Sequence, residues 1–169
     1  MRFELSRLHA FVVDVLTHVD VLPDHAETTA ARLLEADLRG RTGHGIIRLP
    51  QYVKRIEAGG INLRPDIAET RSTPVSCLVD GDNGLGQVVM TLAAEAAIDR
   101  ATETGMAWVG TVRSNHAGAA GVYTDMAMSR DLIAIYMAVA SANVMPPWGG
   151  RERLLGAGPD LGRDPLHGG

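Results

Sequence analysis

The second part of this sequence alternates short apolar runs with helical patterns, and no other feature constrains the fold as strongly. Patterns typical of buried strands occur at 75–80, 106–112 and 132–140. Helical patterns at 87–105 and 118–129 lie between them. Strands that alternate with helices form a sheet layer with helices packed on it. The sequence therefore predicts a mixed α/β fold.

The first third of the chain predicts helices. Apolar residues recur at helical spacing over 5–20, 22–40 and 44–60, and Pro50 predicts a kink or a restart in the third of these. A polar stretch with prolines follows. We expect four parts: a helical segment at 1–60, a connector at 61–74, a partial α/β domain at 75–159 and an irregular tail at 160–169.

Composition excludes several classes of function. The 169 residues have the length of about one domain, and their net charge of −4 argues against a nucleic-acid partner. No apolar run approaches the roughly 20 residues of a membrane span, and the first residues do not resemble a secretion signal. Cys77 is the single cysteine, so neither an internal disulfide nor a thiolate metal cluster is expected. A cytoplasmic protein without a metal site fits these features best.

Two short motifs carry little weight. The "DGDNG" run at 80–84 resembles the start of a calcium loop, but its twelfth position is Thr91 where such a loop has glutamate. A tight turn over 80–86 is the better interpretation. The "GLGQVV" run at 84–89 opens a helix after a strand, yet it lacks the third glycine of a dinucleotide-binding fingerprint.

A stronger pattern lies in "TGHGIIRLPQY" (42–52). His44, Arg48 and Tyr52 recur at i, i+4 and i+8, so a helix would place them on one face. A guanidinium matches a carboxylate with two parallel hydrogen bonds, so an arginine one turn from an imidazole suits a substrate carboxylate. The alternative is a solvated helix face with no binding role.

His116 lies between a predicted strand and a glycine-rich helix start, in "RSNHAGAAGVY" (113–123). Sites in α/β proteins form at such junctions. A helix N-terminus would disfavour the imidazolium and lower the pKa of His116. The small residues at 117–121 would let a ligand approach the backbone. The alternative is a loop histidine that caps the following helix.

Four blocks in this order resemble the type-2 malate/L-lactate dehydrogenase family, which includes ureidoglycolate, sulfolactate and diketogulonate oxidoreductases. They are "DLRGRTGHGIIRLPQYVKRIEAGGIN" (37–62), "VDGDNGLGQVV" (79–89), "SNHAGAAGVY" (114–123) and "PWGGRERLLGAGP" (147–159). The resemblance implies a fold that is not a classical Rossmann domain and assembly as a homodimer or larger homo-oligomer. It also implies hydride transfer with NAD or NADP between a 2-hydroxy acid and a 2-oxo acid.

The resemblance also implies roles for individual residues. It makes His116 and His44 the catalytic histidines, Arg48 and Tyr52 substrate-binding residues, and Ser141 a cofactor contact. Gly43 stands where the family usually has serine. Family members are about twice as long, so the resemblance implies a truncated form. The alternative is a non-catalytic fragment that retains only assembly surfaces.

Overall fold

The computed structural model describes residues 3–138, 146 and 148–151, and the chain divides into two compact units, 1–134 and 135–169. All the helices and strands described below lie in the first unit. The described residues of the second unit, 135–138, 146 and 148–151, form neither helix nor strand.

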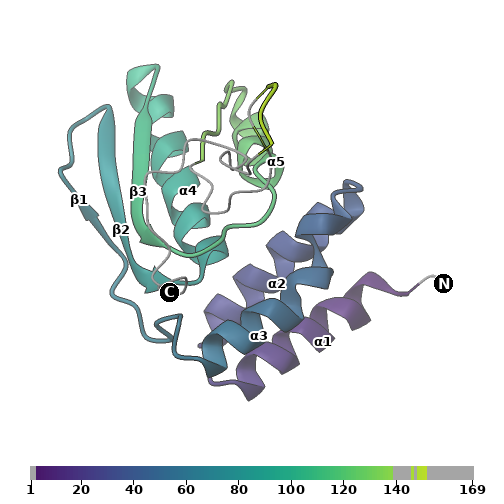
Figure 1. Ribbon diagram of the computed structural model, residues 1–169. Coiled ribbons are helices and arrows are strands. Elements are labelled where there is room, and N and C mark those ends of the chain that lie inside the picture. The colour runs from purple at the N-terminus through teal and green to yellow at the C-terminus, as the bar shows by residue number, and fades with distance from the viewer. Residues whose placement is uncertain (1–2, 139–145, 147, 152–169) are drawn as a thin grey trace. The chain divides into compact units, whose positions relative to one another are not determined.

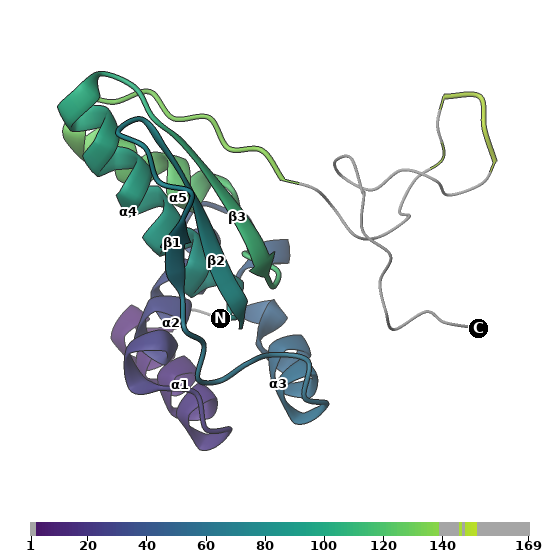
Figure 2. The ribbon, with the colours of Figure 1, turned by 90° about the vertical axis from the view of Figure 1, so that its left-hand side faces the viewer.

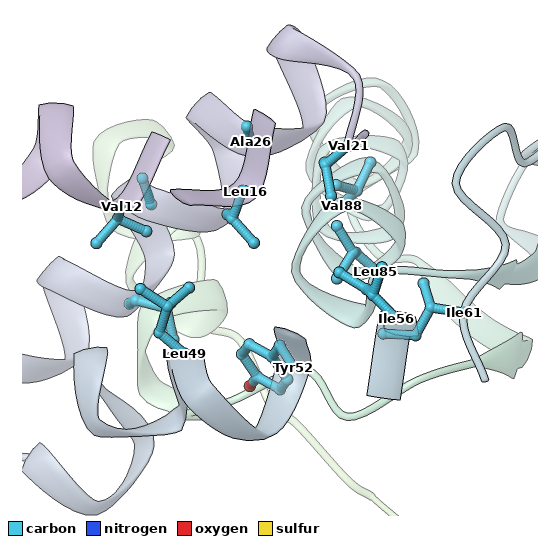
Figure 3. Packing of buried hydrophobic residues seen from close by; sticks show 12 residues of the cluster. Val12, Leu16, Val21, Ala26, Leu49, Tyr52, Ile56, Ile61, Leu85 and Val88 are labelled. Atoms are coloured by element: carbon cyan, nitrogen blue, oxygen red, sulfur yellow. The ribbon is translucent and has the colours of Figure 1, made fainter. Parts of the chain in front are cut away.

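Three helices form one layer of the first unit (Figure 1): α1 (Leu5–His18), α2 (Pro23–Leu38) and α3 (Leu49–Glu57). Their apolar stripes meet in a common core, where Val12, Leu16 and Leu33 are fully buried. Leu85 and Val88, at the start of a later helix, belong to the same core (Figure 3). The helical layer and the sheet layer therefore share packing at that point.

The predicted third helix restarts, as Pro50 indicated. Helix α3 begins at Leu49 with the proline in its first turn, and two short 3-10 turns precede it, η1 (Thr42–His44) and η2 (Ile46–Arg48). An Asp37 carboxylate oxygen accepts the Ile46 backbone N–H at 2.8 Å, and a Cβ at position 45 would overlap that carboxylate. Gly45 therefore lets the chain pass against α2, and the 42–52 segment is not one continuous helix.

The sheet has three strands in the order β1-β2-β3: β1 (Ala68–Thr70), β2 (Ser76–Gly84) and β3 (Trp108–Ser114). Strands β1 and β2 are antiparallel, whereas β2 and β3 are parallel. Helix α4 (Gly86–Thr104) connects the parallel pair and packs along one face of the sheet (Figures 1 and 2). Buried Cys77 and Val79 of β2 contact Val89 and Ala93 of α4, which closes a second core.

One prediction about this region is wrong. The 80–86 stretch is not a tight turn, because β2 continues to Gly84. The turn-forming residues instead produce an irregularity within the strand: Asp82 and Asn83 have φ of 44° and 59°, and the register to β3 shifts between Asp80 and Gly84. A short strand, β1, also lies in the stretch predicted to be a connector.

The region after β3 is less regular than the sequence predicts. The helical pattern at 118–129 forms one α-turn, α5 (Gly121–Thr124), and a 3-10 segment, η3 (Asp125–Arg130). The strand predicted at 132–140 is wrong over 132–138, and its last two residues lie outside the described part. Ile133 is 97% exposed there. An apolar run becomes a strand only with a hydrogen-bonded neighbour, and no described strand pairs with this one.

Candidate active site

His116 follows the end of β3, where the parallel strands β2 and β3 and the start of α4 come together. The Asn115 backbone N–H donates to the Gly84 carbonyl at 3.3 Å, so β2 holds the segment that leads into His116. A Cβ built on Gly86 would lie 2.5 Å from the His116 carbonyl carbon. Glycine at the first position of α4 therefore permits a close approach of two backbones, and this approach places His116.

Three of the predicted site residues converge although they come from different elements. The hydroxyl of Tyr52, on α3, lies 2.9 Å from Nδ1 of His116. The His44 ring, on η1, is stacked on the His116 ring with a centroid distance of 5.8 Å and an interplanar angle of 16°. The structure therefore brings His44, Tyr52 and His116 together by tertiary packing, without the continuous helical face that their spacing suggested.

Tyr52 is buried, and its hydroxyl has a second partner that the sequence did not indicate. Gln87 donates from Nε2 to that hydroxyl at 2.7 Å and is itself fully buried in the first turn of α4. The Gln87 Oε1 atom has no hydrogen-bond partner among the described residues. The only sequence signal for Gln87 was its place in the "GLGQVV" block, which we weighed as a dinucleotide motif.

Arg48 approaches this group from η2. Its Nε donates to the Gly43 carbonyl at 2.6 Å and its Nη1 donates to Gln51 Oε1 at 3.0 Å. These two bonds fix the orientation of the half-buried Arg48 side chain. The other N–H groups of its guanidinium stay available to donate to a ligand. After burial, its positive charge is the next cause that lowers the pKa of His116, and it opposes the burial that raises the pKa of Tyr52, so Arg48 acts on both residues.

Burial and charge determine the protonation states of the site. Partial burial of the His116 ring is the largest cause that lowers its pKa, followed by the charge of Arg48 and then that of His44, although the residue keeps an exposed side. Burial raises the pKa of Tyr52 against the opposing effects of Gln87 and Arg48. At neutral pH the ring is therefore neutral and the phenol protonated. The expected helix N-terminus is not among the causes, and α5 has only four residues.

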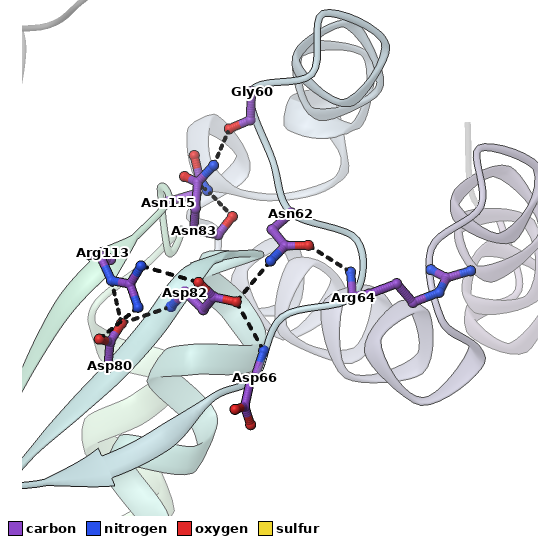
Figure 4. Close-up of polar contacts among 9 residues, drawn as sticks. All are labelled: Gly60, Asn62, Arg64, Asp66, Asp80, Asp82, Asn83, Arg113 and Asn115. Carbon is purple, nitrogen blue, oxygen red and sulfur yellow. Dashed lines mark hydrogen bonds and ion pairs between the residues drawn. The ribbon is translucent and has the colours of Figure 1, made fainter.

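A polar network holds the residue before His116 (Figure 4). Asn115 donates from Nδ2 to the carbonyls of Asn83 and Gly84, at 2.8 and 3.0 Å, and its Oδ1 accepts from Arg55 Nε at 2.8 Å. Asn83 in turn donates to the Gly60 carbonyl at 3.2 Å. Asn115 is thus bonded to both β2 and α3, which fixes the backbone that carries His116.

The two aspartates that resembled a calcium loop belong to the same network. Arg113 binds the Asp80 carboxylate through Nε and Nη2, both at 2.8 Å, and Asp82 accepts from Asn62 at 2.9 Å. The Arg113 side chain holds the pKa of Asp80 below its usual range. Both carboxylates bind donors of the protein itself, so this irregular part of β2 has a structural role.

The described residues fit the substrate side of a nicotinamide reaction but form no phosphate cradle at the start of α4. His116 offers a neutral imidazole and Arg48 a cationic fork. The space in front of Gly86, which a pyrophosphate would occupy in a fingerprint loop, is filled by the carbonyls of Asn115 and His116. Ser141, the predicted cofactor contact, lies outside the described residues.

Comparison with known proteins identifies the family. The model of the malate/L-lactate dehydrogenase family matches residues 3–160. The chain belongs to this family. The resemblance seen in the four sequence blocks is thereby confirmed.

Its relatives are named dehydrogenases. L-sulfolactate dehydrogenase of Methanocaldococcus jannaschii is 42% identical over 148 residues, which cover 88% of the chain and 43% of the relative. Malate dehydrogenase of Pyrococcus horikoshii is 43% identical over 159 residues, 94% of the chain and 44% of the relative. Ureidoglycolate dehydrogenase (NAD(+)) of Escherichia coli K12 is 33% identical over the same share of the chain and 45% of its own length.

The solved structure of the Pyrococcus horikoshii malate dehydrogenase superposes with a TM-score of 0.84 and 39% identity, over 96% of this chain and 48% of that one. The predicted mixed α/β fold of the family is thus confirmed. The chain spans less than half the length of the curated relatives it matches. Within the described part of this malate/L-lactate dehydrogenase family member, no helix has the length and apolar character that crossing a membrane requires.

Proposed function

We propose that this chain carries the substrate-binding and proton-transfer residues of an NAD- or NADP-dependent dehydrogenase that interconverts a 2-hydroxy acid and a 2-oxo acid. One observation carries the proposal: the His116 ring lies with Nδ1 2.9 Å from the Tyr52 hydroxyl and is stacked on the His44 ring. Burial and the charge of Arg48 lower the pKa of this ring, which favours its neutral form at neutral pH. The names of the relatives support it, since malate, sulfolactate and ureidoglycolate are 2-hydroxy acids.

The chemistry assigns each residue a role. Oxidation of a 2-hydroxy acid requires a base that takes the hydroxyl proton, and a histidine whose pKa lies near or below neutrality is suited to this task. Nδ1 is engaged by Tyr52, so His116 meets the substrate with Nε2. The nicotinamide cofactor, when bound, accepts or donates the hydride. In the reverse direction the protonated ring returns the proton to the carbonyl oxygen.

Arg48 would bind the substrate carboxylate and so orient the reacting carbon. Its bonds to Gly43 and Gln51 restrict the guanidinium, which lowers the entropy lost on binding. His44 would contact the substrate from the stacked position, and Tyr52 would hold His116. Ser141 stays a predicted cofactor contact.

A homodimeric assembly, a cytoplasmic location and the four-part organisation at 1–60, 61–74, 75–159 and 160–169 also stay predictions.

The test is a chimera in which residues 1–159 replace the matching part of the Pyrococcus horikoshii malate dehydrogenase. We expect the chimera to oxidise NADH with a 2-oxo acid. His116→Ala should lower kcat by about 10²–10⁴, the contribution of a general acid or base, with nicotinamide affinity nearly unchanged. His18→Ala, at an exposed position on α1, is the matched control and should keep the parental rate. A normal rate in His116→Ala would remove this residue from proton transfer.

A further inference from the structure

A continuous chain of hydrogen bonds runs from inside α4 to the candidate acid/base. Gln87 Nε2 lies 2.7 Å from the Tyr52 hydroxyl oxygen, and that oxygen lies 2.9 Å from His116 Nδ1. Gln87 is fully buried and Tyr52 is 4% exposed. Water therefore has little access to the Gln87 amide and the Tyr52 hydroxyl, although His116 itself has an exposed side, and the donors of these two buried groups must match acceptors within the protein.

The types of donor and acceptor determine which atom donates in each of these two hydrogen bonds. The amide N–H of Gln87 can only donate, so the Tyr52 oxygen accepts from it. A phenol has a single proton, and among the described residues His116 Nδ1 is the one further hydrogen-bond partner of the Tyr52 hydroxyl, so this proton goes to Nδ1. Nδ1 accepts this proton in a hydrogen bond only when it carries none, so the proton of the neutral ring must lie on Nε2.

Gln87 also carries a stability cost that a purely structural role does not explain. Its Oε1 atom is buried without a hydrogen-bond partner in the described part of the chain, so the desolvation of this acceptor is uncompensated. A methionine has similar length and flexibility and would fill the same space without a polar atom. The hydrogen bond that the amide N–H donates to the Tyr52 oxygen therefore explains why an amide stands at this position.

We propose that Gln87 is a positioning residue that acts through Tyr52 to keep the proton of neutral His116 on Nε2. The catalytic consequence of this tautomer rests on the proposed function, because an Nε2–H offers a hydrogen bond to the carbonyl oxygen of a 2-oxo acid. The tautomer itself does not depend on that function. The base role in the oxidation direction needs a free Nε2, so a bound 2-hydroxy acid requires the ring proton to move to Nδ1, and the ligand-free site is arranged to bind the 2-oxo acid.

The test is the tautomer of His116 in the 169-residue chain labelled with nitrogen-15 histidine. Two-bond proton–nitrogen correlation spectra, recorded at a pH where the ring is neutral, distinguish Nδ1–H from Nε2–H, and a His116→Gln variant assigns the signals. The charged and titratable neighbours of the ring, Tyr52, His44 and Arg48, stay in place in the Gln87 variant. No cofactor or substrate is required, so an inactive enzyme would leave this test unaffected.

We expect Nε2–H to predominate in the parent. Gln87→Met frees the Tyr52 oxygen to accept from Nδ1–H, so the ratio of Nδ1–H to Nε2–H should rise about two- to tenfold, the effect of one neutral hydrogen bond. In a Tyr52→Phe background Gln87→Met should add nothing, because the connection is already broken. Thr29→Val removes a second oxygen that is buried without a partner among the described residues, on α2, and should leave the ratio unchanged.

Three results would overturn the proposal. One is Nδ1–H as the major tautomer of the parent, a measurement that needs no Gln87 or Tyr52 variant and so stands even if those variants fail to fold. Another is a parental ratio in a folded Gln87→Met chain. The third is an equal shift from Gln87→Met with and without Tyr52, which would mean that Gln87 acts through general packing.

Discussion

Gly86 lies beneath the backbone that carries His116, and the substitution Gly86→Ala tests whether this approach places the site. A Cβ at position 86 would overlap the Asn115 and His116 carbonyls and lie 2.5 Å from the His116 carbonyl carbon. Ordinary contact begins at 3.4 Å, so the backbone at 115–116 must move by roughly 1 Å. Backbone atoms, unlike a side chain, cannot rotate out of the way.

Two effects of opposite sign act on stability. Alanine favours a helix over glycine by up to about 1 kcal/mol, and less in the first turn. Inserting a methyl group into a packed interior costs about 1–3 kcal/mol, with the upper end expected where the contact is backbone. The clash should dominate, and we expect a net loss of about 2–3 kcal/mol in the free energy of unfolding.

Urea unfolding followed by circular dichroism measures the loss, and the histidine spectra report whether Nδ1 of His116 keeps its bond to Tyr52. In the chimera a displacement of this size should lower kcat by about 10²-fold. Gly121→Ala is the matched control, because α5 begins there and a Cβ meets nothing within 4 Å. A Gly86→Ala chain with parental stability and an unchanged His116 environment would refute the steric argument.

Three further predictions concern the substrate, pH and the isolated chain. Arg48→Lys keeps the charge but loses the two-pronged guanidinium, so it should weaken 2-oxo acid binding by about 1–3 kcal/mol. Calorimetry on the chimera measures this change, and equal affinity would mean that another residue binds the carboxylate. Burial lowers the pKa of His25 and His116 from 6.5, so the unfolded chain binds more protons, and the free energy of unfolding should fall as pH drops below about 6.5. His116→Gln should flatten that fall in urea titrations, and an unchanged slope would contradict the assignment. The isolated chain spans under half the length of the malate dehydrogenase that it matches, and it exposes Trp108 and Ile133. It should therefore form oligomers detectable by light scattering and should not oxidise NADH with oxaloacetate. An active monomer would contradict this expectation.

Much of the secondary structure was predictable because local patterns determine it. The stripes of α1, α2 and α4 and the apolar runs of β2 and β3 each follow from residues close together in the sequence. Pro50 correctly predicted the restart at α3. The 132–138 run was wrong for a non-local reason, because a strand requires a partner and the described sheet ends at β3.

The sequence by itself determined the family and the residue types of the site. The four ordered blocks contain His44, Arg48, Tyr52 and His116, and recognising them required no coordinates. Spacing supplied a reason to group the first three, but its geometric basis was wrong, since 42–48 forms 3-10 turns.

Only the tertiary structure decided how these residues act on one another. Tyr52 meets His116 across 64 positions of sequence, and Gln87 meets Tyr52 across 35. The backbone approach that Gly86 permits, the bond that Tyr52 makes to Nδ1 and the burial that lowers the pKa of His116 all depend on elements packed together after folding. Local sequence patterns specify which face of a helix is apolar, but hydrogen bonds between helices depend on how those faces dock.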